Sequence, residues 1–242
     1  MNVYPVNAIE AASLSSEQKS AYSMMGDLYN KYLAYTADFT DDHVIIEGTW
    51  TDDIPFNSFI IANSNAIQGT FTFYNDNAEL ARLEFNNDEY IKIVENKPGD
   101  VLTTIKGKRF VLELSGTEDI HIGYIYIGEV WVLPQHNSSP AEGLKIRSES
   151  NRSFSGQVTG IPAESLRSFS CSYTRMENKD KKLYDRYLEG VQFVVPHVID
   201  PYSEAHDEFE PMFCTVSEYG EKEKRDESGF YWNFSISWLE AK

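Results

Sequence analysis

The chain has 242 residues, enough for two domains of about 100 to 140 residues that each bury a core without disulfides or metals. Its formal net charge of -17, about half of it from residues 1–80, would repel a phosphate backbone and argues against direct nucleic-acid binding. No stretch reaches 18 consecutive apolar residues, so we expect no membrane insertion.

The N-terminal segment MNVYPVNAIEAAS lacks the basic start and the apolar run of a signal peptide, so secretion by that route is not expected. Residues 15–34 are predicted to form a helix, because their apolar side chains recur at intervals of three and four and would share one face. Ser15 and Gln18 have the spacing of a capping box at its start. The shared face consists of Met25, Leu28, Tyr29, Tyr32 and Leu33.

Six strand-like runs follow this helix. They are HVIIEGTW from His43, FNSFIIAN from Phe56, IQGTFTFYN from Ile67, YIKIVE from Tyr90, RFVLELSG from Arg109 and IHIGYIYIGEVWVLP from Ile120. The groups NDN, NND and NKPGD between them favour turns. Six short strands in one segment predict a β-sandwich with meander or Greek-key connections.

The segment PQHNSSPAEG concentrates Pro, Ser, Asn and Gly, which is typical of a solvated connector. We therefore predict a first domain over residues 1–135, a linker over 136–143 and a second domain over 144–242. In the second domain Phe169, Cys171 and Tyr173 alternate with small polar residues and indicate a half-buried strand. The run from Phe230 to Trp238 alternates in the same way and indicates a core strand.

Between these two strands, residues 178–190 are predicted to form a helix with Asn178 as N-cap and Gly190 as its stop. Its inward side chains would be Leu183, Tyr184, Tyr187 and Leu188. VQFVVPHV and PMFCTVSEYG are predicted to supply two further strands. The expected fold class is thus mostly β / α+β, with an N-terminal sandwich preceded by a helix and a smaller α+β domain.

Cys171 and Cys214 both fall on the apolar face of a predicted strand. We expect buried thiols, although a disulfide stays open if the two strands are adjacent. No metal motif is present among the five histidines. His206 and Asp207 share an acidic loop that invites a calcium or transition-metal site, as do the TDD runs at Thr40 and Thr51, but solvated turns are the favoured interpretation. We expect no metal and no cofactor.

No Gly-x-Ser-x-Gly elbow or phosphate-binding glycine loop is present, and paired carboxylates mean little in so acidic a chain. The chain is therefore expected not to be an enzyme. The candidate contacts to a ligand or a protein partner are Trp50, Tyr202, His206, Asp207 and Phe209. Exposed aromatic side chains suit such contacts because they stack on sugar rings and anchor interfaces.

Three stretches resemble phage tail proteins that join a galactose-binding-like sandwich to a smaller C-terminal domain: FNSFIIANSNAIQGTFTFYNDNAEL, IHIGYIYIGEVWVLP, and VQFVVPHVIDP followed by MFCTVSEYG. The run from Ile122 to Glu129 is similar to an Ile-Gly-x-x-x-x-Gly-Glu strand of these proteins. Together the stretches span most of residues 56–242, and the predicted N-terminal helix has no counterpart. The resemblance implies a jelly-roll or galactose-binding-like sandwich and carries over no catalytic residue.

The resemblance also implies a tail-tip or tail-associated building block, assembled in the host cytoplasm and located in the virion tail. Its partners would be other tail proteins, copies of itself and a host-surface glycan. Two alternatives remain open, a carbohydrate-binding module or adhesin, and a hydrolase. Assembly predicts an oligomer, sugar binding predicts a monomer with a ligand site, and hydrolysis predicts a pocket with a shifted carboxylate pKa.

Overall fold

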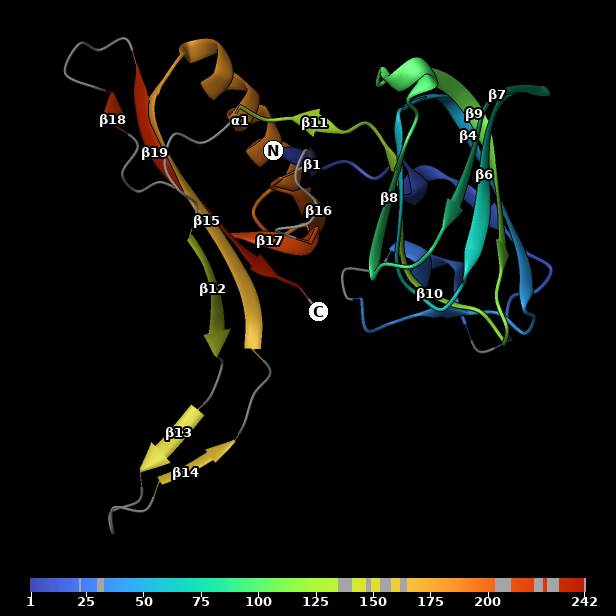
Figure 1. The fold of residues 1–242 in the computed structure, drawn as a ribbon, viewed down its shortest axis with the longest axis horizontal. Coiled ribbons are helices and arrows are strands. Elements are labelled where there is room, and N and C mark those ends of the chain that lie inside the picture. The colour runs from blue at the N-terminus through green and yellow to red at the C-terminus, as the bar shows by residue number, and fades with distance from the viewer. Residues whose placement is uncertain are drawn as a thin grey trace. The chain divides into compact units, whose positions relative to one another are not determined.

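The computed structural model describes residues 1–21, 23–29, 33–134, 141–146, 149–152, 158–161, 165–202, 210–219, 224–225 and 231–241. The chain divides into two compact units, both visible in Figure 1. The sandwich unit comprises Asn2–Val132 together with Asp200–Pro211. The helix unit comprises Met1, Leu133–Ile199 and Met212–Ala241.

The sandwich unit contains strands and three short 3-10 helices. In chain order they are β1 (Asn2–Tyr4), η1 (Ala8–Ala11), β2 (Ser13–Ser15), η2 (Met25–Tyr29), β3 (Ala37–Asp38), β4 (His43–Phe56), β5 (Ser58–Ser64), β6 (Gln68–Asn75), β7 (Ala78–Asn86), β8 (Ile91–Glu95), η3 (Pro98–Asp100), β9 (Ile105–Ser115), β10 (His121–Gly128) and β11 (Trp131–Val132). All six predicted strand runs are present, and the prediction of a mostly-β sandwich is confirmed.

Two antiparallel sheets form the layers of this sandwich (Figure 1). One sheet has the strand order β2-β4-β9-β6-β7, and the other has the order β3-β10-β5-β8. Strand β7 was not among the predicted strands. Its inward positions are Ala81, Leu83 and Phe85, of which only Phe85 is fully buried, so the apolar alternation in its sequence is weak.

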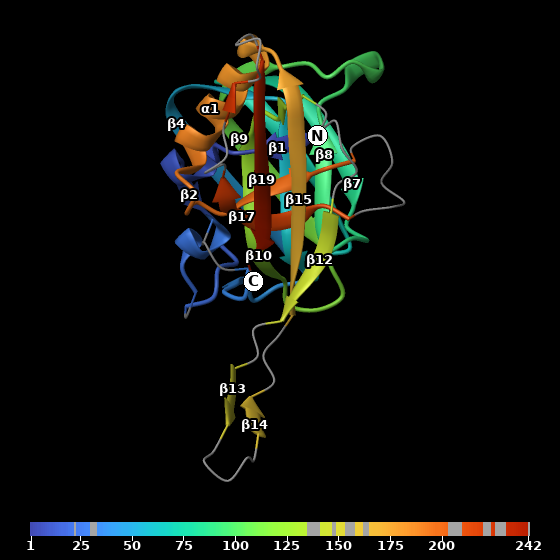
Figure 2. The same ribbon diagram turned by 90° about the vertical axis from the view of Figure 1, so that its left-hand side faces the viewer.

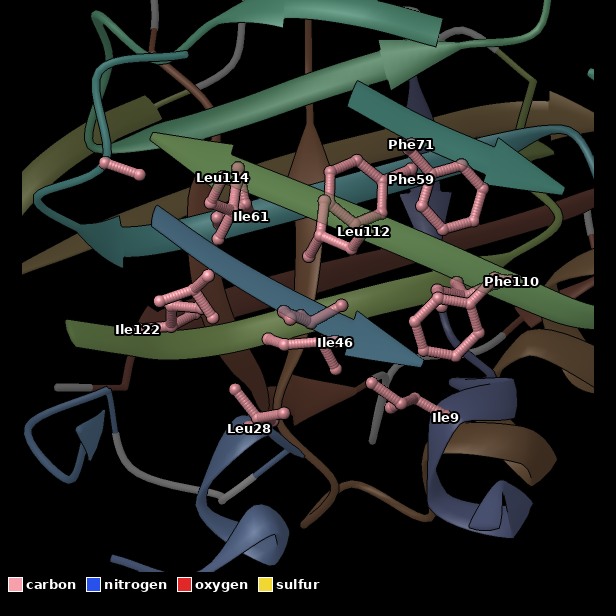
Figure 3. Close-up of a cluster of buried hydrophobic side chains, with 14 of the residues drawn as sticks. Ile9, Leu28, Ile46, Phe59, Ile61, Phe71, Phe110, Leu112, Leu114 and Ile122 are labelled. Carbon is pink, nitrogen blue, oxygen red and sulfur yellow. The ribbon is translucent and has the colours of Figure 1, made fainter. Parts of the chain in front are cut away.

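The core lies between the two sheets because every second residue of each strand points inward. From the five-stranded sheet, Phe71, Phe110 and Leu112 reach the same cluster that Phe59 enters from β5, as Figure 3 shows. The rings of Phe59 and Phe71 stack with centroids 4.7 Å apart. Such aromatic pairs stabilise a core beyond the area that they bury.

The predicted helix over residues 15–34 is wrong. Its described part consists of the end of β2, the 3-10 helix η2 and irregular backbone. The backbone at the start of this segment bonds to residues near β3 and not in a helical pattern: Ser20 N donates to Asp38 O and Thr40 N donates to Gln18 O, both at 2.9 Å. Tertiary hydrogen bonds thus outweigh a helical periodicity that still buries Leu28.

The helix unit contains β12 (Ala141–Ile146), β13 (Glu149–Arg152), β14 (Val158–Ile161), β15 (Ser165–Met176), α1 (Asn178–Val191), β16 (His197–Asp200), β17 (Met212–Tyr219), β18 (Lys224–Arg225) and β19 (Trp232–Glu240). Its antiparallel sheet has the order β16-β17-β19-β15-β12, and β18 pairs with β19. Figure 2 shows β15 and β19 side by side. Strands β13 and β14 pair with each other between β12 and β15 in the chain.

Helix α1 confirms the helix predicted near residues 178–190, but its ends differ. Glu177 takes the N-cap position, and the Asn178 side chain accepts a bond from Trp232 Nε1 instead. At the other end the helix passes Gly190 and stops where Gln192 adopts a left-handed conformation with φ of 47°. Tyr184, Tyr187 and Leu188 are buried as predicted, whereas the burial of Lys181 was not expected.

Two further predictions differ from the structure. VQFVVPHV is not one strand: helix α1 continues to Val191, Gln192 and Phe193 have the positive φ of a turn, and only the segment from His197 forms a strand. The predicted linker over residues 136–143 also overlaps β12, since residues 141–143 pair with β15. The remainder of that linker, residues 136–140, lies outside the described residues.

The two cysteines are buried thiols, as expected. Cys171 lies on β15 and Cys214 on β17, the strands on either side of β19, so they are not on adjacent strands. Burial raises the pKa of Cys171 to about 11 and also raises the pKa of Cys214. Both side chains are therefore protonated and unreactive at neutral pH.

A buried hydrogen-bond chain crosses the core of the helix unit. Trp238 Nε1 donates to Tyr187 Oη at 2.7 Å, and Tyr187 Oη contacts His197 Nε2. His197 Nδ1 lies 3.0 Å from Val195 O, which is an acceptor, so Nδ1 carries the proton and Nε2 accepts from Tyr187. Burial lowers the pKa of His197 to about 4, so the ring is neutral. The polar side-chain atoms of Trp238, Tyr187 and His197 therefore all have hydrogen-bond partners.

Within the described ranges, no helix has both the length and the apolar character required to span a membrane.

Candidate functional site

The outer face of the five-stranded sheet is the face turned away from the core. Because the strands alternate, the residues between the inward-facing ones point to this face. The first outward-facing residue is His43 on β4 and Gln68 on β6. The last outward-facing residue is Asn86 on β7 and Ser115 on β9. The sheet register places these four residues in one row: His43 opposite Ser115, Ser115 opposite Gln68, and Gln68 opposite Asn86.

The next row on the same face holds two carboxylates. Glu113 on β9 lies opposite Thr70 on β6, and Thr70 lies opposite Glu84 on β7. Adjacent strands are about 4.8 Å apart, so the two carboxylates flank Thr70 from either side. A row of polar side chains on four strands is therefore followed by a second row on three, because β4 places Ile45 opposite Glu113.

These two rows line a pocket of about 430 Å³, which we call the outer-face pocket. Its lining consists of His43, Gln68, Gly69, Thr70, Glu84, Phe85, Asn86, Glu113 and Ser115. The volume is within the range of small-molecule sites, roughly 300–1,000 Å³. Seven of the nine lining residues carry side-chain hydrogen-bonding groups, so the pocket suits a ligand with many hydroxyl or amine groups.

Two contacts order the pocket wall. His43 Nδ1 lies 3.2 Å from Ser115 Oγ, and His43 N donates to Asp41 Oδ1 at 3.0 Å. At the opposite rim, Arg82 Nε lies 3.8 Å from Glu84 Oε1, but the two side chains are 51% and 78% exposed. An ion pair with that exposure contributes little, roughly 0–1 kcal/mol.

A second feature lies further along the same face. Arg109 Cζ lies 5.0 Å from the Tyr74 ring centre, and Arg109 Nη2 lies 3.3 Å from Glu47 Oε2. Arg109 and Tyr74 are opposite one another in the β9–β6 register, four residues along β9 from Glu113. This pair is partly exposed, and the Val111–Thr72 row separates it from the pocket residues Glu113 and Thr70.

Of the predicted contact residues, the two that the structure describes, Trp50 and Tyr202, are not in this site. Trp50 is buried, its Nε1 donates to Ala8 O at 2.7 Å, and its ring packs against Phe73 and Phe110 in the core. The prediction of Trp50 as a ligand contact is therefore wrong. Tyr202 is half-buried in a turn of the described chain and is not in the pocket lining. His206, Asp207 and Phe209 lie outside the described residues.

The acidic turns at Thr40 and Thr51 do not make a metal site in the structure. Across the described parts of the chain, no group of three or more His, Cys, Asp or Glu side chains is placed to hold a metal ion. Asp41 instead accepts the His43 backbone bond, and Thr51 continues strand β4.

Sequence reasoning missed the outer-face pocket because its residues come from four strands. Each strand shows only ordinary alternation, in which polar residues mark the solvent side. The missing information was the order β4-β9-β6-β7, which brings Glu113, Thr70 and Glu84 side by side. The one local signal was the density of side chains able to hydrogen-bond at the outward positions of β6 and β7.

No protein-family model matches the sequence, and no curated protein does either. Several solved structures are similar in part. CpGH89CBM32-6 from Clostridium perfringens is 12% identical, with a TM-score of 0.41, over 51% of this chain and 99% of its own. A Streptococcus pneumoniae fucose-binding module, SpX-3, is 11% identical, with a TM-score of 0.41, over 51% of this chain and 98% of its own.

Chitosan-binding module 1 of a chitosanase/glucanase from Paenibacillus sp. IK-5 is 11% identical, with a TM-score of 0.41, over 50% of this chain and 96% of its own. Similarity at this level assigns this chain to none of these groups. None of the three is a phage tail protein, so they give the predicted tail role no support. The galactose-binding-like type of the sandwich stays a prediction.

Proposed function

We propose that this chain is a non-enzymatic carbohydrate-binding protein and that the outer-face pocket holds the sugar. The observation that carries the proposal is the lining of the pocket, where seven side chains with hydrogen-bonding groups converge on about 430 Å³. Each sugar hydroxyl donates one hydrogen bond and accepts others. Gln68, Asn86 and Thr70 offer both donors and acceptors, and the two glutamates accept.

The charge of the pocket restricts the class of ligand that it can bind. Glu84 and Glu113 would repel a phosphate, a sulfate or a sugar acid at neutral pH. Phe85 is the one apolar side chain among the lining residues and its ring packs into the core against Phe59, so the pocket does not suit a lipid or an aromatic compound. A ligand rich in hydroxyl groups and without negative charge fits these residues best.

We propose binding without turnover. His43 and Ser115 are hydrogen-bonded, as a base and a nucleophile would be, but a serine nucleophile also requires a group that orients the imidazole. In the described chain, no carboxylate is hydrogen-bonded to the second ring nitrogen of His43. The contact therefore supports a structural role for His43 in the pocket wall.

The test is a variant that fills the pocket. Thr70 lines the pocket from the outer face of β6, so Thr70→Trp adds volume there without entering the core, and Trp is well tolerated in strands. The matched control is Thr49→Trp, at an exposed outward position of β4 away from the pocket. Glycan-array screening followed by calorimetric titration should show binding by the wild type and by Thr49→Trp, and a loss of about tenfold or more for Thr70→Trp.

Two results would contradict the proposal. One is the absence of binding to every glycan on a broad array, and the other is equal binding by both tryptophan variants. Chromatography of the glycan after prolonged incubation checks the absence of turnover, because a shortened product would make the chain a hydrolase.

Assembly into a larger structure, such as a phage tail, is a second candidate function. The observation that favours it is the edge strand β12, whose outer edge pairs with no other described strand and whose Leu144 is 66% exposed. An open edge offers free backbone donors and acceptors to another chain. Light scattering across a range of concentrations should then exceed the monomer mass of 27.7 kDa, and Leu144→Asp should restore that mass.

The control for that measurement is Val101→Asp, which changes a residue that is 65% exposed outside the strands. A strict monomer at all concentrations would remove the argument from β12.

A further inference from the structure

We infer that the outer-face pocket selects sugars that carry a protonated amine, as glucosamine does, over their neutral counterparts. The inference rests on the proposed function, because it concerns the ligand class of that same pocket. It depends on Glu113, on Glu84 and on the absence of Lys and Arg from the pocket lining.

Glu113 is the central carboxylate. It projects from β9, a strand with neighbours on both sides, between Ile45 and Thr70 of the flanking strands. Its side chain is half-buried, and no ion pair to it is formed in the described part of the chain. A ligand that covers Glu113 removes water from a charge that the protein itself does not neutralise.

Removing water from a carboxylate costs free energy unless a partner compensates it. A neutral hydroxyl compensates with a hydrogen bond alone. An ammonium group compensates with up to three donors and an opposite charge, and hydrogen bonds between ions are roughly twice as strong as those between neutral groups. The ligand that gains most from Glu113 therefore carries an amine.

Glu84 extends this preference at the rim. It lies on the far side of Thr70 from Glu113, and its partner Arg82 does not line the pocket. Since the Arg82–Glu84 pair is exposed, a ligand amine competes with it at small cost. The lining as a whole contains two carboxylates and neither Lys nor Arg.

The charge of the surrounding unit acts in the same direction. Residues 2–132 carry twenty acidic and eight basic side chains, a net charge of -12. Such a field raises the local concentration of cations near the surface, and salt weakens it. This general attraction does not depend on where the amine binds. The experiment therefore separates it from the contribution of the carboxylates in the pocket.

The experiment uses the whole chain and two disaccharides that differ only at the nitrogen, the β-1,4 dimers of glucosamine and of N-acetylglucosamine. Calorimetric titrations at about pH 6 keep the amine of the glucosamine dimer protonated. We expect the glucosamine dimer to bind about three- to tenfold more tightly. Dilysine, which has cationic amines but no sugar ring, should bind more weakly than the glucosamine dimer.

Two variants locate the effect. Glu113→Gln keeps the shape of the side chain and removes its charge, so the affinity ratio of the two dimers should fall towards one, with Glu84 retaining the smaller part of the preference. Glu79→Gln removes an equal charge from an exposed position of the same sheet that is outside the pocket, and it should leave the ratio unchanged. Circular dichroism verifies that both variants are folded.

Equal affinities for the two dimers, or tighter binding of the acetylated one, would overturn the inference and leave carbohydrate binding standing. A ratio that falls as much in Glu79→Gln as in Glu113→Gln would overturn it too, because general attraction would then explain the preference. If neither dimer nor any glycan on the array binds, the proposed function fails and the inference fails with it.

Discussion

Gly107 shows how closely the strands of the sandwich approach one another. It lies on β9, where an added Cβ would be 2.8 Å from the Phe73 ring and closer still to the Tyr74 backbone oxygen. Real Cβ atoms do not approach other atoms so closely, and backbone cannot give way as a flexible side chain can. Gly107→Ala should therefore lower the free energy of unfolding by about 2–3 kcal/mol, measured by urea denaturation.

Gly116→Ala is the matched control, because the nearest atoms to its added Cβ are 3.5 Å away, an ordinary contact. That variant should stay within about 0.5 kcal/mol of the wild type. Equal stability of the two variants would show that β9 relaxes away from β6.

His197 makes stability depend on pH. Its folded-state pKa of about 4 is below its ordinary value near 6.5, so the unfolded state binds more protons between these two values. The free energy of unfolding should therefore fall as pH decreases from 7 to 4, by about 3 kcal/mol from this residue alone. Urea titrations at several pH values should show a shallower fall for His197→Gln, which lacks the titrating ring.

The behaviour of carboxylates is common to both proteins, so the difference between the two pH profiles isolates the histidine. Superimposable profiles would mean that the ring is not held neutral. An independent measurement is the NMR titration of the His197 ring, whose resonances should stay constant until about pH 4.

Individual residues were predictable from sequence where alternation is strict. Phe169, Cys171 and Tyr173 were placed on one buried face, and all three are buried. Trp50 was wrongly predicted to contact a ligand, because the residue type alone does not tell whether an aromatic side chain is buried or exposed. Its burial is decided by Phe73 and Phe110, which reach it from β6 and β9 and are 23 and 60 residues away in the chain.

At the scale of elements, helix α1 is anchored by a lysine. The Lys181 side chain is 7% exposed, and its ammonium pairs with Asp185. The same ammonium lies 5.5 Å from the Tyr219 and Trp232 ring centres and 5.6 Å from that of Phe234. A desolvated cation over aromatic rings gains up to roughly 2 kcal/mol.

Lys181→Met keeps the aliphatic stem of the side chain and removes the charge. It should therefore lower the free energy of unfolding by about 1–2 kcal/mol in urea denaturation. Lys182→Met, at the exposed neighbouring position of α1, should change it by less than about 0.5 kcal/mol. A loss of similar size in both variants would point to helix propensity and not to the aromatic contacts.

Helices and strands were predictable where the periodicity of the sequence agrees with the tertiary contacts of the segment. Helix α1 and strand β19 have strong periodicities, and both formed. The segment 15–34 has a helical periodicity too, yet Ser20 and Gln18 use their backbone groups to pair with the strand near Asp38. A periodic pattern reports which side chains are buried, as Leu28 is, but not which backbone partners are within reach.

At the scale of the whole molecule, negative charge is unevenly distributed. Residues 2–132 have a net charge of -12 out of -17, so self-repulsion should be stronger there than in the rest of the chain. Raising the NaCl concentration from about 10 to 200 mM shortens the screening length from roughly 30 to below 10 Å. Amide hydrogen exchange should then slow more in β4 and β9 than in β15 and β19.

Mass-spectrometric exchange of the intact chain resolves these strands separately. An equal response of both sets of strands would mean that the charges are already paired locally, as Glu47 is with Arg109. A larger response in β15 and β19 would contradict the expectation.

In the strands of the five-stranded sheet, the side chains that would bind a ligand are different from those that form the core. The hydrogen-bonding side chains of the outer-face pocket and the aromatic core occupy alternate positions of the same strands, so changes in one set leave the volume of the other intact. Descendants of this sequence can therefore acquire new ligands by drift at positions such as Gln68, Thr70 and Asn86 without losing the fold. A combinatorial library at these positions offers the same freedom to the protein engineer.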